Sequence, residues 1–293
     1  MTALSTAGVA GAGSVEPPAP VRPGRRGAGA WRWAVLIVLG IYFLVPIAAS
    51  IWFTIRSPKG LTAGAYTGIP SAPGFAEAFG RSLLLGALTV VLALLLMVPT
   101  IVLVTLRLPR LRTTVELLTL APLVLPPIAL VVGVRSVLAW APDYFYGTPL
   151  ADAMFAIQEP SLPWILVFVY VVLALPFVYR ALDAGVRGAD LRTLTEAARN
   201  LGASWPRTLV SVVLPVLRTS VLNAAFLTFA LVLGEYTVAV ILGFTTFPTW
   251  IVDIAGQEPK LSVSVSILSL ALTWVLLLLI SALDRRRAAK ETP

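Results

Sequence analysis

The chain has 293 residues, of which 58% are hydrophobic and 12% are charged. Water-soluble domains carry about 25% charged residues, so this composition excludes an ordinary soluble fold, and it also excludes a disordered chain, which would be polar. Cysteine and histidine are absent from the sequence, which excludes disulfides, thiol catalysis, zinc sites built on these residues and serine–histidine–aspartate chemistry. The sequence therefore predicts a membrane protein.

Six apolar stretches are long enough to cross a bilayer as helices, for which roughly 20 residues are needed. None of them alternates between apolar and polar residues as a barrel strand does. We therefore predict an all-α, polytopic membrane protein with six transmembrane helices. The predicted spans are Trp33–Ile55, Ser82–Leu106, Val115–Trp140, Leu162–Tyr179, Val221–Phe244 and Leu261–Leu283.

Residues 1–30 are rich in Ala, Gly, Pro and Ser and lack the apolar core and cleavage site of a signal peptide. We predict a disordered cytoplasmic tail over residues 1–30 and a transmembrane domain over residues 31–293. The arginines of the tail can contact anionic membrane lipid, although a role in setting topology alone is favoured.

Most of the 22 Lys and Arg residues lie on one side of the predicted spans. By the positive-inside rule, both termini are then cytoplasmic, which an even number of spans also requires. The basic residues on this side are Arg22, Arg25, Arg26, Arg32, Arg107, Arg110, Arg112, Arg180, Arg187, Arg192, Arg199, Arg207, Arg218, Arg285, Arg286, Arg287 and Lys290.

The segment 141–161, predicted to lie outside, carries Asp143, Asp152 and Glu159 and no basic residue. These acids can attract a cationic solute or a delivery protein. The simpler interpretation, that positive charge is kept off this side of the membrane, is favoured.

The predicted cytoplasmic connection from Arg180 to Ser220 has about 40 residues, whereas links between bundle helices commonly have about 2–8. The first part predicts a short helix, with Thr193 as its N-cap and Glu196 completing a capping box. Asp190 is a competing cap one turn earlier.

A second short helix is predicted to follow a break at Gly202, which suits a left-handed residue at a helix end. Ser204 is its expected N-cap and Pro206 lies in its first turn. We expect this helix to end or kink at Leu214-Pro215. The connection thus predicts a helical hairpin at the cytoplasmic surface.

The hairpin carries a recognisable pattern: Glu196-Ala197-Ala198, three residues, Gly202, nine residues, Val212, one residue, and Leu214-Pro215. It resembles the "EAA…G…I.LP" signature of inner-membrane permeases of binding-protein-dependent ABC importers, of the type I, methionine-importer-like fold. Only Val212 departs from it, where the signature prefers Ile. The resemblance implies a coupling helix that docks on an ATP-binding subunit. The residues implied in this contact are Glu196, Ala197, Ala198, Arg199, Gly202, Leu214 and Pro215.

The resemblance also implies partners in the plasma (inner) membrane. None of Lys59, Lys260 and Lys290 lies in a GxxxxGK[ST] phosphate-binding loop. We therefore expect a permease domain that is not an enzyme and binds no cofactor or metal, with ATP and Mg bound by a separate ATPase. The expected partners are two ATP-binding subunits, a second and distinct permease and an extracytoplasmic solute-binding protein, with no nucleic acid.

Two charged residues fall inside predicted spans, where a charge costs about 2.5–3.5 kcal/mol on insertion scales. Glu235, followed by Tyr236, lies near the middle of span five, and Arg135 lies in the outer half of span three. We expect these residues to line the solute path. The alternative is that the two charges pair with each other or with a neighbouring subunit. Span three is also expected to kink or break at its prolines, as helices at transport sites often do.

The solute is less constrained than the class of protein. Gly234-Glu235-Tyr236 resembles a segment shared by sulfate/molybdate-type and polyamine-type permeases, and 245–251 is similar to the corresponding loop of spermidine/putrescine-type permeases. A polyamine is favoured, and thiamine, ferric iron, aminophosphonate and sulfate or molybdate are alternatives. A different class, a proton-coupled secondary carrier with Glu235 as its titrating group, is also possible, whereas a membrane-embedded enzyme lacks candidate catalytic groups.

Overall fold

The computed structural model describes residues 28–58 and 60–288, and these are almost entirely helical. The α-helices are α1 (Ala28–Ile55), α2 (Gly64–Thr67), α3 (Phe75–Leu106), α4 (Arg112–Val124), α5 (Pro127–Leu138), α6 (Trp140–Tyr144), α7 (Pro149–Ala156), α8 (Trp164–Gly188), α9 (Leu191–Asn200), α10 (Trp205–Thr208), α11 (Leu214–Gly234), α12 (Thr237–Leu242), α13 (Phe247–Ala255) and α14 (Pro259–Ala288). Short 3₁₀ turns are η1 (Ile69–Ser71) and η2 (Pro109–Leu111), and η3 (Leu209–Val213) is a π turn. Strands β1 (Arg56–Ser57) and β2 (Gly60–Leu61) form an antiparallel hairpin.

Contacts divide the chain into two compact units, residues 1–49 and 50–293. The first unit contains the greater part of α1 and the predicted tail. The tail lies outside the described residues except for 28–30, which begin α1. All the other elements belong to the second unit.

Four helical stretches of the described chain are long and apolar enough to cross a membrane: Trp31–Ile55, Phe75–Leu106, Trp164–Gly188 and Trp205–Gly234. A fifth is formed if the bent pair Pro109–Val124 and Pro127–Tyr144 counts as one span. The sixth predicted span corresponds to α14, whose described apolar part is Pro259–Val275. The prediction of an all-α polytopic membrane protein is confirmed.

Span three is broken rather than gently kinked. The axes of its two halves differ by 96°. Leu125 and Pro126 have extended backbones, with ψ angles of 127° and 132°. Each precedes a proline, Pro126 or Pro127, whose ring disfavours the helical conformation of the residue before it. The prolines therefore explain the expected break, whereas Pro122 lies inside α4 without interrupting it.

The core of the second unit is built by α3, α8 and α11, which pack against one another along their lengths. Two buried clusters follow these helices, one of them around Leu182 and Leu217 and the other around Leu85 and Leu166. Glycine allows the closest approach: a Cβ atom at Gly185 of α8 would lie 2.0 Å from Oγ of Ser220 in α11. Such small residues let membrane helices approach closely.

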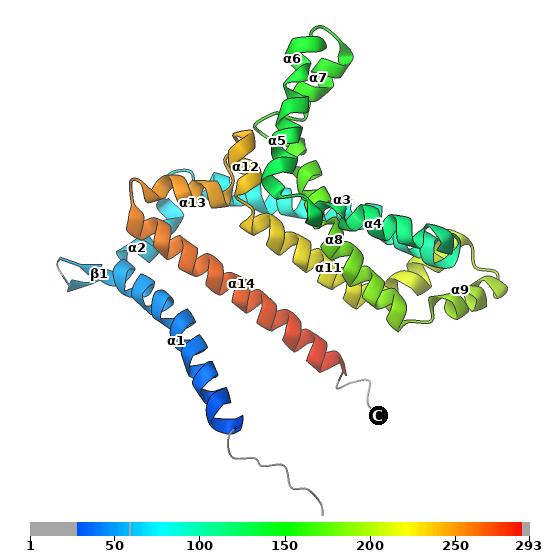
Figure 1. The fold of residues 1–293 in the computed structure, drawn as a ribbon, viewed down its shortest axis with the longest axis horizontal. Helices are drawn as coiled ribbons and strands as arrows, with labels where there is room; N and C mark the ends of the chain where they lie inside the picture. Colours follow the sequence, from blue (N-terminus) through cyan, green and yellow to red (C-terminus); the bar gives the residue numbers. More distant parts are fainter. Residues whose placement is uncertain (1–27, 59, 289–293) are drawn as a thin grey trace, which may run out of the picture. The chain divides into compact units, whose positions relative to one another are not determined.

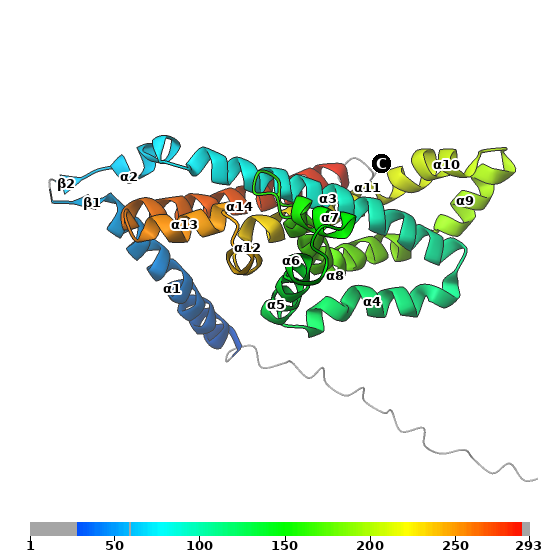
Figure 2. The same ribbon diagram turned by 90° about the horizontal axis from the view of Figure 1, so that it is seen from above.

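One end of this three-helix core is rich in charge. The C-terminal ends of α3 and α8 and the start of α11 meet there, next to α9 and α10 (Figures 1 and 2). Asp183 of α8 accepts hydrogen bonds from Arg112 of α4 (2.6 Å) and Arg187 (2.7 Å), and its carboxylate is largely buried. This ion-pair cluster fastens α4 to α8.

Candidate functional site

Helix α9 begins at Leu191, with Asp190 as its cap. The Asp190 carboxylate accepts a hydrogen bond from the Thr193 backbone N–H at 3.2 Å. Hydrogen bonds from Thr193 hold the pKa of Asp190 below its ordinary value. The prediction of Thr193 as N-cap is therefore wrong and the competing Asp190 is confirmed. Glu196 instead pairs with Arg192 at 3.2 Å, because one turn of helix already precedes it.

Gly202 ends α9 as predicted, in the left-handed conformation with φ +86°. Its N–H donates to the Arg199 carbonyl at 2.9 Å, and the Ala203 N–H donates to the Ala198 carbonyl at 3.1 Å. These two bonds form a Schellman motif, which satisfies the last carbonyls of the helix. The chain thus reverses direction at Gly202 to form the predicted hairpin.

The second helix of the hairpin does not stop where the sequence indicates. Ser204 precedes α10, but its side chain makes no capping hydrogen bond. Beyond α10, the helix continues through the π turn η3 into α11 as one stretch, Trp205–Gly234. The helix does not end at Leu214-Pro215, one of the two predicted outcomes: Pro215 lies in the first turn of α11, directly after η3. The π turn interrupts the regular bonding pattern just where the missing N–H of proline would disturb it.

The hairpin is fastened to the core by both of its helices. The guanidinium of Arg107, at the end of α3, lies 4.5 Å from the ring centroid of Trp205 in α10. Leu191 of α9 and Val213 of η3 are buried in the same cluster as Leu182 of α8. A force on the hairpin would therefore be transmitted to α3, α8 and α11.

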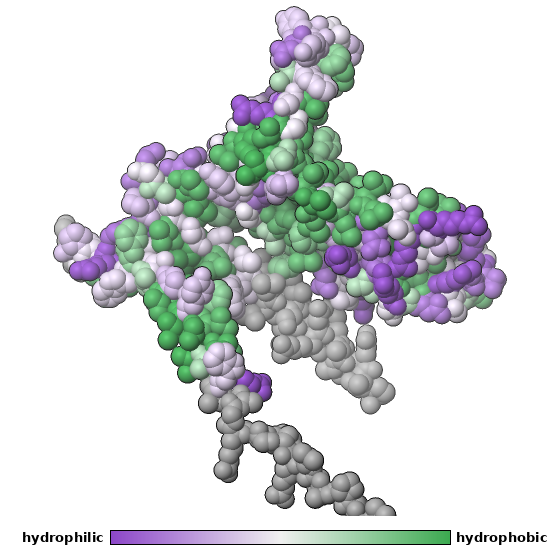
Figure 3. All heavy atoms as spheres, viewed as in Figure 1, coloured by the Kyte–Doolittle hydropathy of each residue, from purple (hydrophilic) through white to green (hydrophobic). Residues whose placement is uncertain are grey.

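The other side of the hairpin is open. We use the name coupling surface for five of its exposed residues: Glu196, Ala197, Arg199, Leu201 and Gly202. Leu201 is 89% exposed, and the hydrophilic residues around this end are visible in Figure 3. Ala198 is half-buried, as is Leu214, whereas Pro215 is exposed on the helix that follows.

Glu235 lies at a helix break, not within a continuous span five as predicted. Helix α11 ends at Gly234, Glu235 is extended, and α12 begins at Thr237. Both oxygens of the half-buried carboxylate accept from the Val238 N–H, at 3.0 and 2.9 Å. The buried hydroxyl of Tyr170 in α8 faces this carboxylate. The carboxylate thus caps the start of α12.

Arg135 lies at the opposite end of the same short helix. Its guanidinium donates to the Ile241 carbonyl in the last turn of α12 at 3.4 Å. The two intramembrane charges therefore bind opposite ends of α12, a positive group at the carbonyl end and a negative group at the N–H end, as the helix dipole favours. Tyr236 lies between Glu235 and α12, with 36% of its surface exposed.

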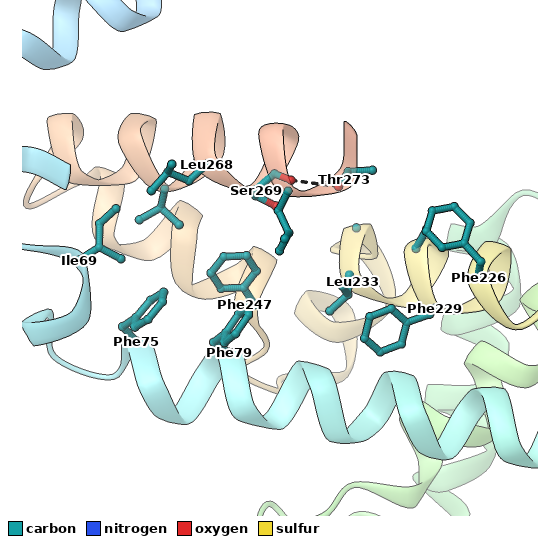
Figure 4. Close-up of a pocket in the computed structure, with 14 residues that line it drawn as sticks. Ile69, Phe75, Phe79, Phe226, Phe229, Leu233, Phe247, Leu268, Ser269 and Thr273 are labelled. Atoms are coloured by element: carbon teal, nitrogen blue, oxygen red, sulfur yellow. Dashed lines mark hydrogen bonds between the residues drawn. The ribbon is translucent and has the colours of Figure 1, made fainter. Parts of the chain in front are cut away.

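A cavity of about 470 Å³ lies beside this break, with walls from α3, α11, α13 and α14. Five of its lining residues are phenylalanines, and all five are labelled in Figure 4: Phe75, Phe79, Phe226, Phe229 and Phe247. Its polar members are few, and Thr273 donates to the Ser269 carbonyl at 2.9 Å. The residues described as lining the cavity include no charged side chain.

Sequence reasoning did not find this cavity. The signal that was available is the repeat of phenylalanine at helical spacing, Phe75 with Phe79 and Phe226 with Phe229. The same pattern is typical of an ordinary apolar helix face. The walls of the cavity also come from distant parts of the chain, so the sequence alone does not reveal it.

No family model matches the sequence. In an alignment of 273 residues that covers 89% of the chain, the chain is 23% identical to the probable ABC transporter permease protein y4fN of Sinorhizobium fredii (strain NBRC 101917 / NGR234). The chain is similar to an ABC transporter permease. It spans about half the length of this curated relative, 46%. Together with the apolar helices, this similarity supports a multi-pass membrane protein.

Proposed function

We propose that this chain is a permease subunit of an ATP-binding-cassette importer and forms half of a translocation path. The observation that carries the proposal is the coupling surface, an open face on a hairpin whose other face is packed against the core. The hairpin holds the importer-permease signature at Glu196, Ala197, Ala198 and Gly202. The similarity to a probable ABC transporter permease supports the same function.

The proposed role assigns each residue of the signature a physical task. Glu196, Ala197 and Gly202 contact the ATP-binding subunit, and Arg199 and Leu201 border that contact. Ala198 supports it from the half-buried side, and Leu214 and Pro215 connect the hairpin to α11. The short side chains allow the backbone of the partner to approach closely.

The energy source is proposed to be a separate ATPase that binds ATP and Mg. Two such subunits, a second and distinct permease and an extracytoplasmic solute-binding protein complete the assembly in the plasma membrane. We infer that the hairpin is cytoplasmic, because Arg107, Arg110, Arg112 and the arginines of 180–218 follow the positive-inside rule. With an even number of spans, both termini are then cytoplasmic as well.

We propose a polyamine such as spermidine or putrescine as the solute. Support comes from Asp143, Asp152 and Glu159, which are exposed on and beside α6 and α7, in a segment without basic residues. Negative potential at the entrance raises the local concentration of a polycation. Thiamine, ferric iron, aminophosphonate, and sulfate or molybdate are the alternative outcomes of a ligand screen on the associated binding protein.

Substitutions in the coupling surface test the proposal. Tagged chain is purified from its own membranes with its partners, and MgATP hydrolysis and solute uptake are measured. We expect Glu196→Lys and Gly202→Asp to remove the ATPase from the complex and to abolish uptake. The first reverses the charge at the contact, and the second adds a charged side chain where glycine has none. The chain itself should still insert into the membrane.

Two controls separate contact from folding. Arg192→Gln removes the ion pair of Glu196 but leaves its carboxylate in place. Gly147→Asp introduces the same strain as Gly202→Asp, since Gly147 also has a positive φ (75°), in the loop between α6 and α7. Both controls should keep the ATPase bound. Uptake that survives both test variants contradicts the proposal, and uptake that collapses with the proton gradient but ignores ATP favours a secondary carrier.

A further inference from the structure

One helix connects the coupling hairpin to the helix break at Glu235. The stretch Trp205–Gly234 has 30 residues, which as helix measure roughly 45 Å and exceed the roughly 30 Å of bilayer hydrocarbon. It is packed against α8 and α3 at the buried residues Leu217 and Ala224. Because a packed helix moves as a rigid element, a displacement of α10 is carried to Gly234.

The break itself has few constraints of its own. A Cβ atom at Gly234 would meet no atom within 4 Å, and Glu235 has an extended backbone with ψ 118°. Glu235 and Tyr236 lie between the two helices, and a short link of this kind can act as a hinge because its residues absorb changes in φ and ψ.

Helix α12 beyond the hinge has only six residues, too few to be stable alone. Three kinds of contact hold it. Glu235 accepts from Val238 at its start, Arg135 donates to Ile241 at its end, and Val238 and Ala239 are fully buried against α5 and α8. We name the pair Glu235 and Arg135 the α12 latch.

The segment that follows α12 is tied to α3. Arg81 donates to the Thr245 carbonyl at 3.1 Å, and the Phe247 N–H donates to Oγ of Ser82 at 2.7 Å. Phe247 also lines the cavity of about 470 Å³ described above, which we name the phenylalanine cavity after its five phenylalanines. Gly234, on the other side of α12, lines it as well. The two ends of the latched segment therefore both belong to the cavity wall.

We propose that Glu235 and Arg135 are positioning residues that latch α12, and that movement of the hairpin along α11 releases this latch to open the phenylalanine cavity. The proposal rests on the proposed function, because the movement is supplied by the ATPase. It replaces the expectation that the two charges contact the solute: both are engaged with backbone groups of α12.

Uptake by Glu235 variants separates a latch from a solute ligand. The amide oxygen of Glu235→Gln still accepts from Val238 but carries no charge, whereas Glu235→Ala loses both. A latch predicts uptake within about threefold of the wild type for Gln and a loss of about tenfold or more for Ala, the fold-change expected for a lost cap. ATP hydrolysis should persist in both, uncoupled from uptake in the Ala variant.

A direct readout of α12 is available because the chain has no cysteine. Ala239→Cys places a thiol at a buried position, and Val240→Cys places one at a neighbour that is 45% exposed. In purified complex in lipid nanodiscs, we expect N-ethylmaleimide to label Cys at 239 slowly. Adding Glu235→Ala or Arg135→Ala should accelerate that labelling about tenfold, and labelling at 240 should not change.

Two outcomes overturn the inference. One is a Gln variant as defective in uptake as the Ala variant, which would make the charge of Glu235 the required property. The other is unchanged labelling at 239 in both Ala backgrounds. If no ATPase accompanies the wild-type chain, the proposed function fails instead, and the labelling experiment still decides whether the latch exists.

Discussion

Loss of the buried carboxylate of Asp183 should destabilise the protein measurably. Asp183→Ala removes two short charge-assisted hydrogen bonds and leaves Arg112 without its partner. The Asp183 side chain is 11% exposed and that of Arg112 36%, so this interaction is only partly screened. Breaking a fully buried pair costs about 3–5 kcal/mol and breaking an exposed one less than about 1 kcal/mol.

The intermediate exposure of this cluster leads us to expect a loss of about 2–3 kcal/mol for Asp183→Ala. In a chain of this size, that loss corresponds to roughly 5–10 °C in the midpoint of thermal unfolding. The midpoint can be measured in detergent by fluorescence-detected size-exclusion chromatography after heating. Asp183→Asn, which keeps an acceptor oxygen without the charge, should fall between the wild type and Asp183→Ala.

Glu77→Ala is the matched control. Glu77 also pairs with an arginine four residues away at 2.7 Å, but its carboxylate is 74% exposed. We expect a smaller change in the unfolding midpoint for this variant, because the Glu77 carboxylate is exposed and Arg81, whose side chain is 17% exposed, keeps its hydrogen bond to the Thr245 carbonyl. Equal midpoints for Asp183→Ala and Glu77→Ala would refute the reasoning that burial makes the Asp183 cluster a tie between α4 and α8.

Two further predictions concern the packing of the core and the start of α9. Gly185→Ala should lower the unfolding midpoint by the equivalent of about 1–3 kcal/mol, because its Cβ would overlap Ser220. Ser220→Gly in the same chain should restore the midpoint. As a control, Gly80→Ala should not destabilise the protein, because a Cβ atom at Gly80 would lie in open space. Because the pKa of Asp190 is lowered in the folded state, its cap contributes above the ordinary pKa of about 3.9 and is lost as the pH falls through the folded pKa. The protection of the α9 amides from exchange, taken relative to the intrinsic exchange rate at each pH, should therefore be unchanged between about pH 5 and 8 and fall only in stronger acid, and Asp190→Leu should show the lower protection at every pH.

Local signals in the sequence predicted the elements that local chemistry controls. Apolar length located the membrane helices, the prolines of span three predicted a kink or break in it, and Gly202 located the reversal of the hairpin. Each of these features depends on neighbouring residues alone. The predicted N-cap of α9, Thr193, was wrong by less than one turn, because Asp190 is also a good capping residue and lies three positions earlier.

Features that depend on distant contacts were missed. Nothing in Leu233-Gly234-Glu235-Tyr236 requires a break, since the segment contains no proline. The break is stable because Glu235 caps α12 and Arg135, about 100 residues away in sequence, binds its other end. The phenylalanine cavity likewise needs four separate segments to be brought together before it exists.

The π turn Leu209–Val213 sets the relation between the hairpin and the membrane helix that follows it. Such a turn holds one more residue than the α-helical turn it replaces, so the two flanking helices are out of phase by one position. One position of a helix is a rotation of about 100°. A chain that lacks Val210 would keep every signature residue, with one residue fewer between Gly202 and Val212, and would present Leu201 and its neighbours in a different direction relative to α11.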